Sequence, residues 1–111
     1  MTQDMLVETQ QDVELRDLAR YFYALKEIWR LRMLGALAEH DELSVSDLAE
    51  RMEISQPLVS WHLRRLRQAR IVAVRRVGRV SYYSLNREQL ATYQLAWDEM
   101  LHVVEHSPDV A

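Results

Sequence analysis

Residues 44–65, SVSDLAERMEISQPLVSWHLRR, contain two helix starts in close succession. At the first start, Ser44 and Asp47 form a capping box, because each side chain can bond the backbone amide of the other residue. This pattern predicts a short helix over 45–52. Its apolar residues repeat at helical spacing and are expected to face inward: Val45, Leu48, Ala49 and Met52.

The second helix start follows a tight connection at residues 53–54. Ser55 is a candidate N-cap and Pro57 lies in the first turn, so a helix is predicted over 55–69. At about 100° per residue, one apolar stripe is expected to be buried, formed by Val59, Leu63 and Leu66. Trp61 lies nearly opposite this stripe, which predicts an outer-face position; a core position is the alternative.

Residues after the second helix are β-branched and aromatic, which predicts a β-hairpin. The runs at 71–76 and 80–85 flank VGR at 77–79, where the glycine suits a turn. The hairpin is therefore expected to project directly after the helix pair.

Helical periodicity also precedes the quoted stretch and follows the hairpin. One helix is predicted from residue 11 and another over about 28–39, with no Pro or Gly to place the break between them. In the first helix the apolar residues that repeat at helical spacing are Leu15, Leu18, Phe22 and Leu25. In the second, one side is expected to hold Leu31, Leu34, Leu37 and Ala38. After the hairpin, Asn86 is a candidate cap for a last helix over about 87–106.

The element order predicts the fold class. Four helices, a small β-hairpin and a fifth helix describe a mainly α winged helix-turn-helix. We expect a single domain over residues 11–106, between a flexible N-terminus at 1–10 and a C-terminal tail at 107–111. In such domains the second helix of the tight pair enters the major groove of DNA.

Charge is distributed unevenly along the 111 residues. Residues 55–87 hold eight arginines and no acid, whereas the rest of the chain has six basic and seventeen acidic residues. A strongly basic segment in a chain of net charge −3 favours a local anion-binding surface over an ordinary solvated face. The residues expected to contact DNA are Ser55, Gln56, Ser60, Trp61, His62, Arg64, Arg65, Arg75, Arg76 and Arg79.

Several classes of function are disfavoured by what the sequence lacks. There is no cysteine, which excludes a disulfide framework, a thiolate metal site and a cysteine nucleophile. The N-terminus does not resemble a secretory signal and no apolar run is long enough to span a membrane, so we expect a cytoplasmic protein. No catalytic set is visible, and we expect no enzyme. The H-x-x-E-H pattern at 102–106 is typical of zinc peptidases, but no third ligand is positioned downstream.

Two residue groups leave alternatives open. Asp98, His102 and His106 lie at spacings of four on the last predicted helix, and such donors suit zinc, nickel or cobalt. They are candidate metal ligands or ordinary surface residues near the chain end, and no other cofactor is indicated. The aromatic residues of the first, second and last helices can form an interface core or line a small-molecule pocket: Tyr21, Phe22, Tyr23, Trp29, Tyr93 and Trp97.

Residues 18–86 resemble the ArsR/SmtB family of winged-helix repressors. The resemblance is strongest in RLRML, in ELSVSDLAERMEISQPLVSWHLRRLR and in GRVSYYSLN. It implies a homodimer built from the first and last helices, an operator with two half-sites, and release of DNA when a small-molecule or metal effector binds. It also implies DNA contact through Ser55, Gln56, Ser60, Trp61, His62 and the hairpin arginines.

The chain departs from the family pattern in several places. Members that sense arsenite or soft metals have two cysteines where this chain has Ser44 and Ser46, and hydroxyls do not replace thiolates for soft ions. The usual Asp-Pro-Thr-Arg is EIWR at 27–30, and the usual Gly after the reading helix is Arg70. Zinc-sensing members carry an Asp-x-His near the start of the last helix, which residues 90–92 do not supply.

Two functions are consistent with this sequence. The first is a dimeric, sequence-specific transcriptional repressor that occupies a promoter. The second is a winged helix used for protein–protein contact without DNA. Salt dependence separates them, because a protein that neutralises several phosphates loses DNA affinity steeply as salt rises.

Overall fold

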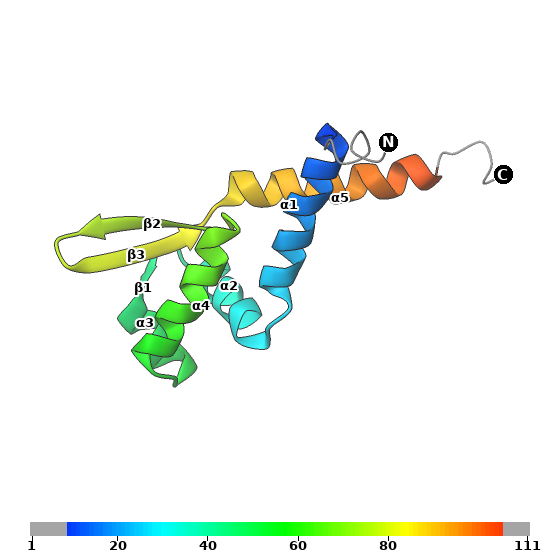
Figure 1. The fold of residues 1–111 in the computed structure, drawn as a ribbon. Coiled ribbons are helices and arrows are strands. Elements are labelled where there is room, and N and C mark those ends of the chain that lie inside the picture. The colour runs from blue at the N-terminus through cyan, green and yellow to red at the C-terminus, as the bar shows by residue number, and fades with distance from the viewer. Residues whose placement is uncertain (1–8, 106–111) are drawn as a thin grey trace, which may run out of the picture.

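The computed structural model describes the backbone of residues 9–105 and the side chains of residues 9–102. Its elements are α1 (Gln10–Leu25), α2 (Ile28–Glu39), β1 (Leu43–Ser44), α3 (Val45–Met52), α4 (Gln56–Gln68), β2 (Val72–Val77), β3 (Val80–Leu85) and α5 (Arg87–Glu105). This order confirms the predicted winged helix-turn-helix (Figure 1). Thr9 caps α1, so the first helix starts one residue before the expected position. The rest of the predicted flexible N-terminus and the predicted C-terminal tail lie outside the described residues.

The break between α1 and α2 lies at residues 26–27, a position that the sequence left open. Glu27 is the N-cap of α2, and its carboxylate accepts hydrogen bonds from the amides of Trp29 and Arg30. A carboxylate at a helix N-terminus satisfies free amides and interacts favourably with the helix dipole. The chain therefore starts a new helix here without a proline or glycine.

The buried face of α2 differs from the predicted one. Met33 and Leu37 are buried together with Arg30, whereas Leu31 and Ala38 are exposed. The prediction for Leu31 and Ala38 was wrong, because it assigned the inward face by leucine spacing alone. The inward face instead includes an arginine, whose guanidinium finds hydrogen-bond acceptors on α1 and α4.

A short strand joins the predicted hairpin, so the sheet has three strands in the order β1-β3-β2. The expectation of a hairpin alone was incomplete. In β1, Leu43 lies opposite Tyr83 and Ser44 opposite Tyr82, in antiparallel register. The hairpin itself turns through residues 78–79, where Gly78 has a φ of 61° that L side chains rarely adopt.

Arg70 ends α4 in the left-handed conformation, with a φ of 59°. The amide of Arg70 donates to the Arg67 carbonyl at 2.9 Å, and the amide of Ile71 donates to the Leu66 carbonyl at 3.0 Å. These bonds close the helix end in the way that a glycine usually allows. The family resemblance pointed to this position, and here a non-glycine residue occupies it.

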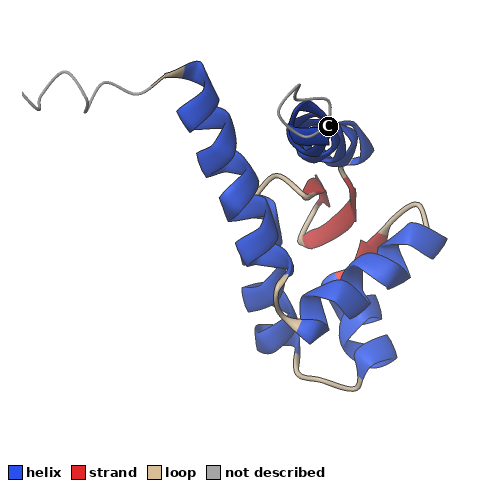
Figure 2. Ribbon diagram, turned by 90° about the vertical axis from the view of Figure 1, so that its right-hand side faces the viewer, coloured by secondary structure: helices blue, strands red, loops and turns tan. Residues whose placement is uncertain are grey.

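One apolar core joins the helices to the sheet. It consists of Leu18, Ala24, Met33, Leu37, Leu43, Leu48, Ala49, Val59, Leu63, Leu66, Ala69, Ile71, Val72 and Tyr93. The predicted inward stripe of α4 belongs to it in full. The hairpin projects away from α1 and α5 (Figure 1), and Figure 2 shows α5 nearly end-on beside the long α1. Within residues 9–105, no helix has the length and apolar character that crossing a membrane requires.

Candidate nucleic-acid interface

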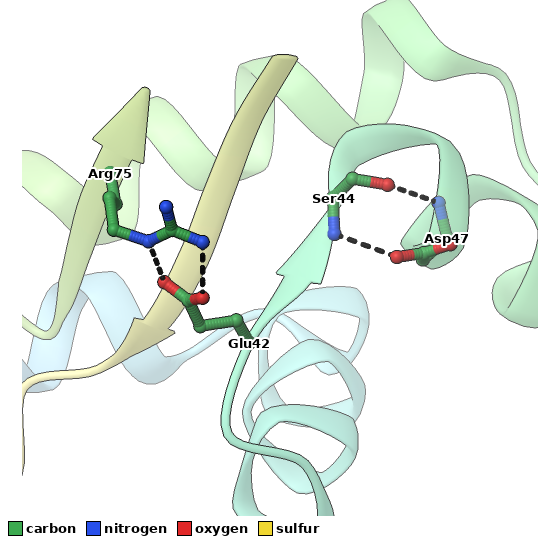
Figure 3. Close-up of polar contacts among 4 residues, drawn as sticks. All are labelled: Glu42, Ser44, Asp47 and Arg75. Carbon is green, nitrogen blue, oxygen red and sulfur yellow. Dashed lines mark hydrogen bonds and ion pairs between the residues drawn. The ribbon is translucent and has the colours of Figure 1, made fainter. Parts of the chain in front are cut away.

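Side chains near the helix ends set the positions of α3 and α4. The Ser44 hydroxyl accepts from the Asp47 amide at 3.1 Å, and the Asp47 carboxylate accepts from the Ser44 amide at 3.0 Å (Figure 3). These bonds with Ser44 lower the pKa of Asp47. Glu53 ends α3 in the left-handed conformation, and Ser55 then caps α4 by accepting from the Leu58 amide. Both predicted caps are therefore confirmed.

Trp61 lies on the outer face of α4, as predicted. Its side chain is 41% exposed, whereas Val59 and Leu63 are fully buried. The Arg65 guanidinium lies 4.9 Å from the ring centroid, and the Arg30 guanidinium of α2 lies 5.4 Å from it. Both cations are within the range of cation–π attraction, so they hold the indole in place at the surface.

Most other predicted contact residues of α4 are also at the surface. Ser55, Gln56, Arg64 and Arg65 are exposed, and Ser60 is half-buried. The Gln56 amide donates to the Ser46 hydroxyl at 3.2 Å, which joins the first turns of α4 and α3. The start of α4 thus combines helix-end amides with polar side chains, a combination that suits a phosphate.

His62 does not belong to this surface, contrary to the prediction. Its side chain is 3% exposed, and its Nδ1 accepts a hydrogen bond of 3.2 Å from Arg30 Nε. His62 is three residues after Val59 and four before Leu66, so it shares their buried face.

The environment of His62 also decides its charge. A guanidinium can only donate, so Nδ1 is unprotonated and the neutral ring carries its proton on Nε2. Burial lowers the pKa of His62; Glu27 opposes this effect and the nearby Arg30 charge adds to it. A buried, neutral ring with a partner inside the protein is unavailable for base or phosphate contact.

The hairpin arginines lie in different environments. Arg75 donates from Nε and Nη2 to the carboxylate of Glu42, at 2.9 and 2.8 Å (Figure 3). This two-point bond lowers the pKa of Glu42 and raises that of Arg75. Arg76 and Arg79 are exposed, and neither has an ion-pair partner in the part of the chain that the structure describes. Arg76 and Arg79 are therefore the hairpin cations with unneutralised charge.

Four of the six predicted aromatic residues meet between α1 and α5. Tyr21 stacks on Tyr93 with ring centroids 4.4 Å apart, and Phe22 meets Trp97 edge-on at 5.0 Å. The other two lie apart from this cluster and are covered by cations: Tyr23 by Lys26, and Trp29 by Arg32. The four clustered rings therefore form a contact between α1 and α5 within one chain, and the choice between an interface core and a pocket stays a prediction.

The candidate metal ligands on α5 are only partly described. Asp98 and His102 are exposed on the helix, and His106 lies outside the described residues. Among the side chains of residues 9–102, no three His, Cys, Asp or Glu come together in a way that could hold a metal ion. The metal site therefore stays a prediction, as does the peptidase-like pattern that ends at His106.

Sequence reasoning missed two residues that shape the interface. Arg30 is buried, although arginine side chains usually face water, and only its match to the family's Asp-Pro-Thr-Arg motif hinted at a role. Glu42 lies before the capping box, outside the basic segment, so nothing local pointed to its bond with Arg75. Both partnerships join residues more than 30 positions apart.

Comparison with known proteins agrees with this geometry. The family model for bacterial regulatory proteins of the arsR family matches residues 29–74, which extend from α2 into β2. The transcriptional repressor SmtB homolog of Synechocystis sp. is 49% identical over 72 residues, or 65% of this chain and 54% of that protein. The chain thus spans about half the length of that relative.

Two further matches cover more of the known protein. The arsenical resistance operon repressor of Bacillus subtilis is 34% identical over 83 residues, which are 75% of this chain and 78% of that protein. The second is a solution structure of a homodimeric winged helix-turn-helix DNA-binding domain from Mycobacterium bovis, a possible ArsR-family regulator. It matches with a TM-score of 0.70 and 25% identity, over 90% of each chain.

Proposed function

This chain belongs to the ArsR family of bacterial regulatory proteins, and we propose that it is a DNA-binding transcriptional repressor that acts as a dimer in the cytoplasm. The relatives described above are named as regulators rather than as enzymes, and the proposal requires neither a catalytic activity nor a cofactor. Repression follows when the bound dimer blocks access to a promoter.

The observation that carries this proposal is the exposure of Trp61 on α4, beside arginines that face solvent. In the proposed complex α4 enters the major groove, where Gln56 and Ser60 reach base edges and the indole covers thymine methyl groups. Arg64 and Arg65 neutralise phosphates beside them. The hairpin contacts the adjacent backbone or minor groove, chiefly through Arg76 and Arg79.

Exposed apolar residues of α1 and α5 support a dimer. A cavity of about 630 Å³ lies between the two helices, with Leu15, Leu18, Leu95 and Met100 among its lining residues. Leu95 is 58% exposed and Leu15 is 42% exposed, so the two leucines form an exposed apolar surface across this cavity. A second copy of the chain would cover this surface, and two α4 helices could then reach successive major grooves about 34 Å apart.

The first test is a footprint of the purified chain on the DNA upstream of its own gene, with excess non-specific competitor. A protected site with two-fold symmetry, together with a dimer in sedimentation, is the expected result. Affinity should fall steeply from low to physiological salt, because several phosphates are neutralised. Absence of DNA binding, or DNA binding that salt does not weaken, would instead favour a winged helix for protein–protein contact.

A further inference from the structure

A second cavity, of about 380 Å³, lies between α1 and α4. Four arginines line it, together with a tyrosine and an amide: Arg16, Arg20, Arg30, Arg65, Tyr23 and Gln68. The remaining lining residues are alanines, and no carboxylate is among them. The volume is within the usual range for small-molecule sites.

Arg30 is the most informative residue of this cavity. It is 6% exposed, and its two hydrogen bonds go to neutral acceptors, His62 Nδ1 and the Ala24 carbonyl. Within the described part of the chain, no carboxylate forms an ion pair with it. A buried guanidinium without a direct ion-pair contact is costly, even when a helix C-terminus lies nearby.

Two of the other cavity arginines, Arg20 and Arg65, have partners that do not line the cavity. Arg20 is paired with Asp17 at 3.4 Å, but this is an exposed pair on the surface of α1. Arg65 lies over the Trp61 ring. The cavity therefore concentrates positive charge around a buried guanidinium, and an oxyanion is the chemical partner that such a set favours.

We propose that this cavity binds a small aromatic oxyanion, such as an aromatic phosphate or carboxylate. The guanidinium groups would bind its oxygen atoms, and the ring would lie among the alanines and against Tyr23, which is 64% exposed. The cavity adjoins α4, whereas the proposed dimer surface uses Leu15 and Leu18 toward α5, so dimer formation through that surface leaves it open.

Occupation of the cavity would act on the DNA-reading surface, a step that rests on the proposed function. Arg30 and Arg65 line the cavity and also flank Trp61. An anion that draws these two guanidiniums inward weakens their hold on the indole. The ligand would thus change DNA affinity through Trp61, and DNA would change ligand affinity by the same factor.

The test is a titration of the full-length ¹⁵N-labelled protein with phenyl phosphate at constant ionic strength, followed by NMR. We expect saturable shifts at the Ala19 and Gln68 amides and at the Trp61 indole N–H. Arg20→Gln should weaken binding about 10-fold, because it removes a charge at an exposed position. Arg51→Gln removes the same charge from α3, outside the cavity, and should leave binding unchanged. Phenol, which lacks the charge, and inorganic phosphate, which lacks the ring, should bind more weakly.

Several results would overturn the proposal. Absence of saturation at ~10 mM phenyl phosphate, or equal weakening by Arg20→Gln and Arg51→Gln, would exclude the cavity as the site. If inorganic phosphate binds as tightly as phenyl phosphate, the aromatic ring does not contribute to binding. Saturable binding without a shift of the Trp61 indole N–H would exclude coupling between the cavity and the DNA-reading surface. DNA binding is measured separately on the same sample, so a chain that binds phenyl phosphate but no DNA would refute only the repressor.

Discussion

Arg30 and His62, which are 32 residues apart in the chain, are joined by a buried hydrogen bond of 3.2 Å from the guanidinium Nε to the imidazole Nδ1. The bond ties α2 to the inner face of α4. The same guanidinium also lies over Trp61 on the outer side. One buried arginine therefore links the core of the domain to the surface that is proposed to read DNA.

Acid should weaken the fold through His62. Its pKa in the folded state is below the ordinary 6.5, so the unfolded chain binds more protons in this range. The stability due to the neutral ring is therefore complete above pH 6.5 and is lost as the pH falls from 6.5 through the lowered pKa. Urea unfolding at about pH 7.5 and about pH 5.5 measures this loss. His62→Gln should show a smaller decrease than the parent chain, and an equal decrease would contradict the assignment.

Removal of the Arg30 side chain should destabilise the domain. Arg30→Ala breaks the bonds to His62 and to the Ala24 carbonyl and should lower the free energy of unfolding by about 1–3 kcal/mol. The control is Arg67→Ala on the exposed side of α4, where the change should stay within about 0.5 kcal/mol. Similar losses in the two variants would show that the buried bonds are not the cause.

Loss of the Trp61 ring should affect DNA binding more than folding. Trp61→Ala should weaken binding to the operator about 10-fold or more, because the indole is at the proposed base-contact surface. Its unfolding free energy should change by less than about 1 kcal/mol. Leu63→Ala, on the buried face of α4, should cost about 2–5 kcal/mol instead. A Trp61 variant that unfolds as readily as the Leu63 variant would refute an outer-face role.

Neutralisation of Glu42 should strengthen non-specific DNA binding. Glu42→Gln removes the carboxylate that holds Arg75 and frees this cation on the hairpin. The slope of log affinity against log salt concentration should steepen by about one unit. Glu88→Gln, which changes net charge equally but lies on α5, controls for overall charge.

Arg76→Ala should have the opposite effect on the salt dependence. Arg76 is an exposed hairpin cation without an ion-pair partner in the described residues, so its loss should make the slope shallower by about one unit. Binding should weaken about equally for all DNA sequences. A change in sequence preference would indicate base contact rather than phosphate contact.

A charge in the cavity between α1 and α5, introduced at a leucine that lines it, should separate the dimer into monomers. Leu95→Glu places a carboxylate on the exposed apolar surface of α5, and sedimentation should then show a folded monomer. Leu31→Glu introduces the same charge at an exposed leucine of α2, outside this cavity, and this variant should stay dimeric. If both variants sediment as dimers, the α1–α5 surface is not the interface.

The sequence by itself determined the helix caps, the tight pair of helices, the hairpin and the outward direction of Trp61. These features depend on short-range physics: a capping side chain bonds an amide three residues away, and apolar residues three or four apart share a helix face. The match to a known family pattern added the expected dimer and the expected contact residues. The same periodicity failed at Leu31 and Ala38, because neighbouring elements decide which face of a helix is buried.

Only the tertiary structure decided where the polar side chains of the interface find their partners. His62 was expected at the DNA and is instead buried against Arg30. Arg75 was also expected to contact DNA, and its guanidinium is bound to Glu42. The pairing of β1 with β3 was equally invisible, because a strand of two residues has no periodicity of its own. Each of these contacts joins segments that are distant in sequence, and their energies depend on burial and geometry that exist only once the chain has folded.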